Sequence, residues 1–230
     1  MLNTAVADEL MQFADELEKA DNFEAALSKL IRRELAAHRR ILFNGNGYSE
    51  EWPLEAARRG LLNLRSTPEA LIHYTDEKNV ALFARHGVYT RTEIQSRQDI
   101  NMEEYAKIIH IEALTLIDML GKLIVPACAA YSGKLAEGVA AKAGIGVDAP
   151  AEAAQVRLLT EKTAELIERT ERLKAVVADE PEALNARAMY EHEAVIPAME
   201  AARQVADELE GRVGKEYWPM PSYADLLFYV

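Results

Sequence analysis

The hydrophobic residues of this chain recur at steps of three and four, and the longest such stretch runs from Thr90 to roughly Lys142. That spacing places them on one face of an α-helix. Thr90 and Glu93 have the spacing of a capping box at the helix start, and Tyr89 and Ile94 that of a hydrophobic staple. At about 1.5 Å per residue the helix would be roughly 75 Å long, so other segments must cover its stripe. The expected stripe consists of Ile94, Tyr105, Ile108, Ile109, Leu116, Ile117, Leu120, Leu123, Ile124, Tyr131 and Leu135.

Two more long helices follow a glycine-containing linker from Gly144 to Ala151. The first has an alternating three-four repeat of the heptad kind, and the second starts near Asp179. Short connections make consecutive helices antiparallel, which predicts a three-helix bundle with coiled-coil-like packing. Pro126 and Pro197 interrupt helical patterns and are expected to kink them. The two repeats are Val156, Leu159, Thr163, Leu166, Thr170, Leu173 and Val177, and then Ala188, His192, Val195, Met199, Ala202, Ala206, Leu209 and Val213.

The residues before the long helix predict several shorter helices joined by tight turns. The first helix spans residues 2–19 and begins without a clear cap, which suggests a cut end of a longer protein. Asp21, Ser49, Thr67 and Thr75 are the expected starts of the next four. Two apolar faces are expected here, formed by Leu2, Val6, Leu10, Phe13 and Leu17 and by Phe23, Leu27, Leu30, Ile31 and Leu35.

The pattern as a whole predicts an all-α protein. We expect residues 1–88 to form a subdomain of short helices and residues 89–216 the long three-helix bundle. Residues 217–230 form an apolar tail, which we expect to dock on the bundle or on a partner.

Composition narrows the possible functions. Half of the 230 residues are hydrophobic, enough for a core, and the net charge is -12. Because no basic run or basic face is apparent, neither a nucleic acid nor an anionic membrane surface is an expected partner. The single cysteine, Cys128, lies in an apolar run and is expected to be a buried structural thiol. With no signal peptide and no membrane span in the pattern, we expect a soluble cytoplasmic protein.

One stretch carries weak signals of cofactor binding, namely Asn44, Gly45, Asn46 and Gly47. It is glycine-rich but lacks the Lys-Ser/Thr of a P-loop and the strand-turn-helix context of a dinucleotide fold. A turn in which the glycines supply positive φ is therefore favoured over phosphate binding. We expect no cofactor in this chain.

Two further clusters combine histidine with carboxylates. Glu191, His192 and Glu193 are adjacent, but neighbouring helical residues point in different directions, so no metal site is expected. His192 falls on the helix seam and is interpreted as a hydrogen-bonded core histidine. His110, with Glu112 and Asp118 nearby in the long helix, is interpreted the same way. No catalytic residues are predicted.

Several longer motifs resemble the C-terminal portion of type III glutamine synthetases. The resemblance covers essentially the whole chain and is specific at Phe43-Asn-Gly-Asn-Gly-Tyr-Ser-Glu-Glu-Trp-Pro-Leu-Glu-Ala-Ala-Arg-Arg-Gly-Leu61. Leu2 to Leu10 resembles a helix that follows the end of the active site in that family. The remaining motifs are Glu77 to Phe83, Ile111 to Asp118, Val125 to Ala127 and Tyr217 to Phe228.

The resemblance implies that this chain lacks the catalytic residues of the family. In that family the metal-binding carboxylates, the ATP site and the substrate-binding arginines lie N-terminal to this stretch, and none matches a position here. The parent enzymes use ATP and magnesium to make glutamine from glutamate and ammonia. They assemble as stacked hexameric rings. The resemblance therefore implies an assembly, structural or regulatory role, with the catalytic domain of the parent enzyme and neighbouring subunits as partners.

A free-standing helical interaction module with its own partner is the alternative. In the fragment interpretation the apolar face of residues 2–19 has lost its natural cover. Either the helix folds back onto Phe23, Leu27 and Leu30, or its face pairs between chains. Weak self-association or partial disorder of the helix is favoured over complete internal burial, because the second helix needs its own apolar face for the bundle.

Overall fold

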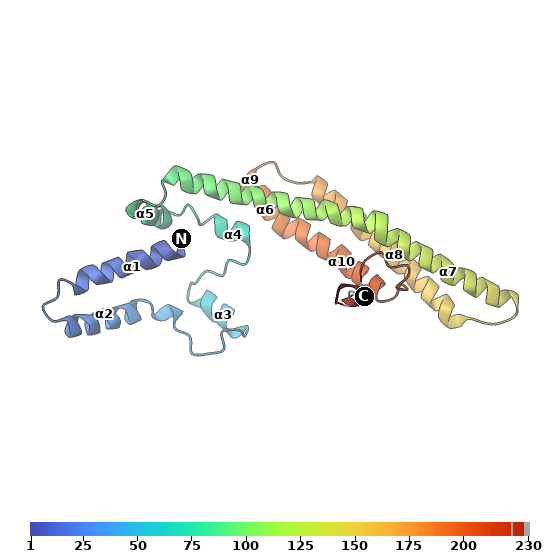
Figure 1. Ribbon diagram of the computed structural model, residues 1–230, viewed down its shortest axis with the longest axis horizontal. Coiled ribbons are helices and arrows are strands. Elements are labelled where there is room, and N and C mark those ends of the chain that lie inside the picture. The colour runs from blue at the N-terminus through green and yellow to red at the C-terminus, as the bar shows by residue number, and fades with distance from the viewer. Residues whose placement is uncertain (222, 228–230) are drawn as a thin grey trace. The chain divides into compact units, whose positions relative to one another are not determined.

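The computed structural model describes residues 1–221 and 223–227, and the regular elements in that part of the chain are helices. It divides into two compact units, residues 1–102 and 103–230. The division falls inside one helix, α6 (Arg91–Met119), rather than at its start. The expected boundary between residues 88 and 89 stays a prediction. Figure 1 labels the elements of both units.

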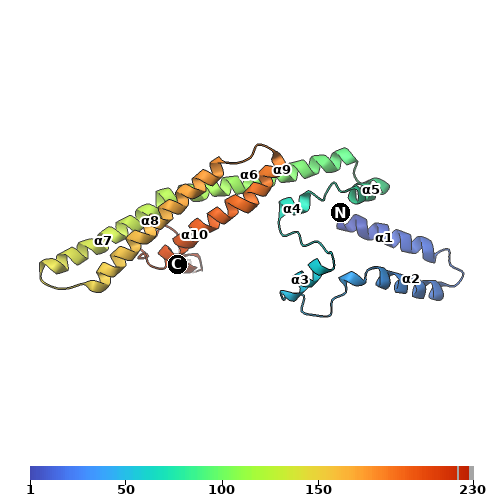
Figure 2. The same cartoon turned by 180° about the vertical axis from the view of Figure 1, so that it is seen from behind.

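The first unit contains five α-helices before α6, and α1 and α2 run side by side in both views (Figures 1 and 2). The capping box at the start of α6 is confirmed, because Glu93 N–H donates to Thr90 Oγ1 at 3.3 Å and Thr90 N–H to Glu93 Oε2 at 2.7 Å. The preceding elements are α1 (Leu2–Leu17), α2 (Phe23–Ala37), the 3-10 turn η1 (Arg39–Ile41), α3 (Glu51–Arg58), α4 (Thr67–Leu71) and α5 (Glu77–Arg85).

The caps predicted for α2, α3 and α5 are wrong by one residue, whereas α4 starts at Thr67 as predicted. Asn22, not Asp21, caps α2 by accepting a hydrogen bond from Ala25 N–H at 3.0 Å. Ser66 caps α4 in a full capping box, so Thr67 is already its first residue. Ser49 and Thr75 cap nothing, since α3 and α5 follow Glu50 and Asp76 without a side-chain cap. At α2 and α4, which do have side-chain caps, the capping residue has an extended backbone.

The core of the first unit surrounds Phe83, which is fully buried with Val80 and Ile94. The rings of Tyr74 and Tyr89 pack on either side, with Tyr89 5.3 Å from Phe83 between centroids. The hydrophobic staple expected between Tyr89 and Ile94 thus becomes part of a small aromatic cluster. This cluster fixes the chain direction at the entry to α6.

The second unit is the predicted antiparallel three-helix bundle, and α7, α8 and α10 lie along one another in Figures 1 and 2. The heptad repeat of α8 is confirmed, because its positions from Leu159 to Val177 are buried or partly buried. After α6 the elements are the π turn η2 (Leu120–Ile124), α7 (Val125–Gly144), α8 (Pro150–Ala178), α9 (Leu184–Tyr190), the π turn η3 (Glu191–Val195), α10 (Ile196–Glu210) and α11 (Tyr223–Leu227).

The bundle core draws on all three long helices. Its main cluster includes Leu120, Cys128, Leu159 and Leu209, each fully buried, so the expectation of a buried structural thiol is confirmed. Two members of the predicted stripe are instead exposed, namely Ile108 and Leu123. In α6, buried alanines occupy inward positions on either side of Ile108. These are Ala106 and Ala113.

Each proline expected to kink a helix follows a π turn. Val125 N–H donates to the carbonyl of Leu120, and Ile196 N–H to that of Glu191, which is the five-residue step of a π-helix. Pro126 and Pro197 come directly after these donors. A proline lacks an N–H and its ring collides with the carbonyl four residues earlier, and the wider turn removes that collision. The extra residue in each turn also rotates the helix face that follows.

The tail begins docked on the bundle. Tyr217 and Trp218 pack against the main core, and the rings of Tyr217 and Tyr131 lie 5.3 Å apart. Lys215 forms an ion pair with Asp225 at 2.7 Å, whereas Leu226 and Leu227 are exposed. Residues 222 and 228–230, which belong to the expected tail, lie outside the described residues. In the described part of the chain, no helix combines the length and apolar character needed to cross a membrane.

Candidate functional site

The glycine-rich loop forms a closed turn between η1 and α3. The Asn46 side-chain oxygen accepts a hydrogen bond from Tyr48 N–H at 3.0 Å, and its backbone oxygen accepts one from Ser49 Oγ at 2.8 Å. These bonds form an Asx turn, so the hydrogen-bonding oxygens of Asn46 are satisfied within the loop. Residues 44–48 of the loop are exposed.

The reason for a glycine at position 45 differs from the predicted one. Neither Gly45 nor Gly47 has positive φ, so the expectation that these glycines supply it is wrong. A Cβ added at Gly45 would lie 2.4 Å from Cζ of Phe43. The ring therefore lies directly over the glycine backbone, and it also stacks on Trp52 with centroids 4.7 Å apart. Gly45 serves packing, because any side chain there would displace the ring.

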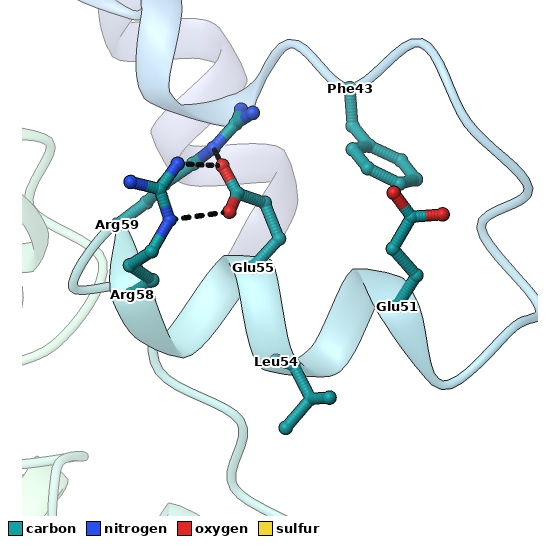
Figure 3. A pocket seen from close by; sticks show the side chains of 6 residues that line it. All are labelled: Phe43, Glu51, Leu54, Glu55, Arg58 and Arg59. Atoms are coloured by element: carbon teal, nitrogen blue, oxygen red, sulfur yellow. Dashed lines mark hydrogen bonds and ion pairs between the residues drawn. The ribbon is translucent and has the colours of Figure 1, made fainter.

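A cluster of arginines borders this loop. Figure 3 shows Glu55 between Arg58 and Arg59 on α3, with Leu54 pointing away from them. Glu55 accepts hydrogen bonds from Arg58 Nε at 2.6 Å and from Arg59 Nε at 2.5 Å. The neighbouring pocket of about 530 Å³ is lined by Arg39, Arg40, Leu42, Asn44, Glu55, Arg58 and Arg59.

The electrostatics of this pocket limit what it can bind. The hydrogen bonds from Arg58 and Arg59 lower the pKa of Glu55 to about 2, so the carboxylate is charged at neutral pH. Arg59 also donates to the backbone oxygens of Arg40 and Leu42. Two of the four arginines that line the pocket, Arg58 and Arg59, therefore pair with Glu55. Sequence reasoning missed this local basic patch, because its two arginine pairs, Arg39–Arg40 and Arg58–Arg59, come from separate segments that only the fold brings together.

A second cluster lies in the bundle, where the π turn η3 faces α6. His110 Nδ1 is 3.5 Å from Glu180 Oε2 and 3.6 Å from Glu191 Oε1. Glu180 lies in the connection between α8 and α9, and its other oxygen pairs with Arg187 Nε at 3.2 Å. Of the three, only Glu191 is fully buried. One donor atom from each of His110, Glu180 and Glu191 lies within 4.8 Å of the other two.

The histidine and carboxylate groupings suggested by the sequence do not form. His192, expected on the seam as a hydrogen-bonded core histidine, is half-buried, and the fully buried position of this turn belongs to Glu191. The extra residue of the π turn causes this change of face. Glu193 is exposed, and Asp118 pairs with Lys122 on the surface, away from His110. Glu180 could not have been found from spacing, since it comes from a loop far along the chain.

Burial dominates the electrostatics of Glu191. Together with the nearby Glu180 carboxylate, burial raises the pKa of Glu191 to about 7. Burial and then Glu191 also raise the pKa of Tyr105. Neither oxygen of Glu191 has a hydrogen-bond partner, and neither does His110 Nδ1. This cluster therefore contains donor atoms that the protein itself does not satisfy.

The third feature is an apolar groove between α1 and α2. It has a volume of about 540 Å³, and Glu34 is its one charged lining residue. Leu10 is 60% exposed and Leu35 54% exposed, so the two helices cover each other incompletely. Apart from Glu34, the lining consists of Leu10, Phe13, Ala14, Leu17, Leu27, Leu30, Ile31 and Leu35.

Comparison with known proteins assigns this chain to a family. Residues 26–143, more than half of the chain, match the family described as glutamine synthetase C-terminal domain. The type-3 glutamine synthetase of Dictyostelium discoideum is 35% identical, with 99% of this chain and 32% of the relative covered. The glutamine synthetase of Bacteroides fragilis is 32% identical, covering 99% and 33%. That of Butyrivibrio fibrisolvens is 34% identical, covering 90% and 30%.

These comparisons and the helical fold define the class as a helical domain of the glutamine synthetase type. The chain belongs to the glutamine synthetase C-terminal domain family and is homologous to type III enzymes. It spans about a third of the length of the curated relatives it matches.

Proposed function

We propose that this chain is the non-catalytic C-terminal part of a type III glutamine synthetase and works in the cytoplasm. The parent enzyme would join ammonia to glutamate with ATP and magnesium, using residues outside this chain. The family match and the coverage of a third of each relative support this proposal. The closed glycine loop supports it too, because its polar groups bond within the loop.

We propose further that its role is assembly, through the groove between α1 and α2. The exposed apolar lining of this groove is the observation that carries the proposal. Fully burying a leucine or isoleucine contributes roughly 1.5 to 3 kcal/mol, so covering Leu10, Ile31 and Leu35, each about half exposed, would contribute about 1 kcal/mol per side chain. The proposed occupant is the remaining part of the parent enzyme, either in the same chain or in a neighbouring subunit.

The position of α1 suits such an interface. Its opposite face is fixed within the first unit, because Asp8 accepts hydrogen bonds from Arg85 at 2.8 Å and lies 2.8 Å from His86 Nε2. The groove side has no comparable polar anchor apart from the pair between Glu16 and Arg33 at 2.7 Å. A partner would therefore meet a preformed helix rather than a segment that must fold on binding.

The test combines an activity assay with a binding assay. The 230-residue chain is assayed for glutamine formation, and none is expected. It is then mixed with the N-terminal two thirds of the Dictyostelium enzyme and examined by size exclusion with light scattering. We expect a complex that the double change Leu10→Glu, Phe13→Glu abolishes. Lys19→Glu is the matched control, since it adds the same charge difference at an exposed position outside the groove.

The outcomes separate the two parts of the proposal. Glutamine formation by the chain alone would show that it is catalytic. A complex that survives the double change would place the interface elsewhere. Association of the chain with itself, without binding to the enzyme, would favour the alternative of a free-standing interaction module. A reading frame for the catalytic part directly upstream in the genome would argue against that alternative.

A further inference from the structure

Three side chains from different segments converge where η3 meets α6. His110 comes from α6, Glu180 from the connection between α8 and α9, and Glu191 from η3. The distances from His110 Nδ1 to the two carboxylates, 3.5 and 3.6 Å, are too long for good hydrogen bonds. This explains why the donor and acceptor atoms remain unsatisfied.

Of the three residues, Glu191 has the environment that most favours a bound ion. Its side chain is 0% exposed and neither carboxylate oxygen has a hydrogen-bond partner. A buried carboxylate without a partner is strongly unfavourable, and such groups in proteins are normally paired or bound to a metal. The nearby cation, Arg187, pairs with Glu180 rather than with Glu191. The cluster thus directs one imidazole and two carboxylates at one point, and the imidazole approaches the two carboxylates only to 3.5 and 3.6 Å.

The spacing fits a small metal ion. In tetrahedral zinc sites the bonds to nitrogen and oxygen are about 2.0 to 2.2 Å, which places neighbouring ligand atoms roughly 3.4 Å apart. The observed separations of 3.5 and 3.6 Å are close to that value. One imidazole and two carboxylates are ligands of zinc and similar transition metals, whereas magnesium and calcium favour oxygen alone. We propose that His110, Glu180 and Glu191 bind one divalent transition-metal ion, with Zn²⁺ the preferred ion.

The surroundings allow an ion to enter and to be held. The His110 side chain is 33% exposed, which gives access from solvent, while Glu191 closes the inner side. Arg187 holds Glu180 in place through its second oxygen, as outer partners of metal ligands commonly do. With three protein ligands a fourth position is left for water. The ion would join the loop between α8 and α9 to α6, so its expected role is structural.

The experiment uses the 230-residue chain stripped of metal with a chelator and dialysed at pH 7.5. Titration calorimetry with Zn²⁺ is expected to show one ion per chain. Glu191→Gln should weaken binding by at least about 100-fold, since it removes a direct ligand. Glu193→Gln is the matched control, because it makes the same change two residues along at an exposed position and should leave binding unchanged. His110→Gln and His192→Gln form a second such pair.

Folding is checked separately from binding. Glu191→Gln keeps the side-chain size and removes a buried charge, so the variant should retain its helical circular dichroism. Zn²⁺ should raise the melting temperature of the parent chain and of Glu193→Gln, but not that of Glu191→Gln. Equal zinc binding by Glu191→Gln and the parent would overturn the proposal. So would a parent chain that binds no zinc, in which case a proton shared by Glu180 and Glu191 is the occupant. Both results are independent of whether the chain assembles with a catalytic domain.

Discussion

The substitution Leu120→Ala tests whether the core of the bundle lies where the structure places it. Leu120 is fully buried in the π turn η2, against residues of α8 and α10. The substitution removes three buried carbons, and at 0.8 kcal/mol per methylene this loses about 2.4 kcal/mol of hydrophobic stabilisation. The cavity left behind adds to this, so the unfolding free energy should fall by roughly 2 to 5 kcal/mol. Leu123, in the same turn and 44% exposed, is the control, and Leu123→Ala should cost roughly 1 kcal/mol.

The assay is urea unfolding followed by the fluorescence of Trp218, which packs on this core. A Trp52→Phe background removes the other tryptophan, which lies in the first unit. The midpoint should shift strongly for Leu120→Ala and weakly for Leu123→Ala, with unchanged dependence on urea. If the two changes have equal effects, or if Leu120→Ala is neutral, the assignment of the bundle core is incorrect.

Three further predictions concern the first unit. Thr90→Ala removes the cap of α6 and should lower the unfolding free energy by about 1 kcal/mol in the same kind of urea experiment. Calorimetric titration with Mg-ATP should show no binding, and micromolar binding that Asn46→Ala removes would contradict this. The hydrogen bond with His86, and then that with Arg85, lowers the pKa of Asp8 below 3.8, so its stabilisation is present above pH 3.8 and is lost as the pH falls through the lowered pKa. The destabilisation by Asp8→Asn should accordingly be large at pH 6 and smaller at pH 3 in urea unfolding, and equal effects at both would refute the assignment.

The features that sequence reasoning predicted depend on local patterns. The capping box at Thr90 needs only two residues three positions apart, and the heptad repeat of α8 needs only regular spacing. Both are properties of a single helix. The predicted caps of α2, α3 and α5 lie one residue too early, because neighbouring polar residues such as Asp21 and Asn22 are equally able to cap. Backbone conformation, which depends on tertiary contacts, decides between them.

The cluster around His110 could not be predicted because its position depends on irregular backbone. A regular helical repeat assigns the inward position to His192, but the π turn gives it to Glu191. Pro197 was the available signal, since a proline within a helical pattern demands a local adjustment. Its usual interpretation is a kink, which does not change the count of residues per turn. The contribution of Glu180 depends on how a loop folds back, which spacing does not encode.

The buried cysteine gives this protein an internal reporter of transient opening. Burial raises the pKa of the Cys128 thiol, so in the closed bundle it is both inaccessible and protonated at neutral pH. A thiol reagent can react only when the helices separate. The labelling rate divided by that of an unfolded peptide then measures the equilibrium of that opening. Because the sequence contains a single cysteine, mass spectrometry of the intact chain would follow the transient opening of the bundle without any engineered probe.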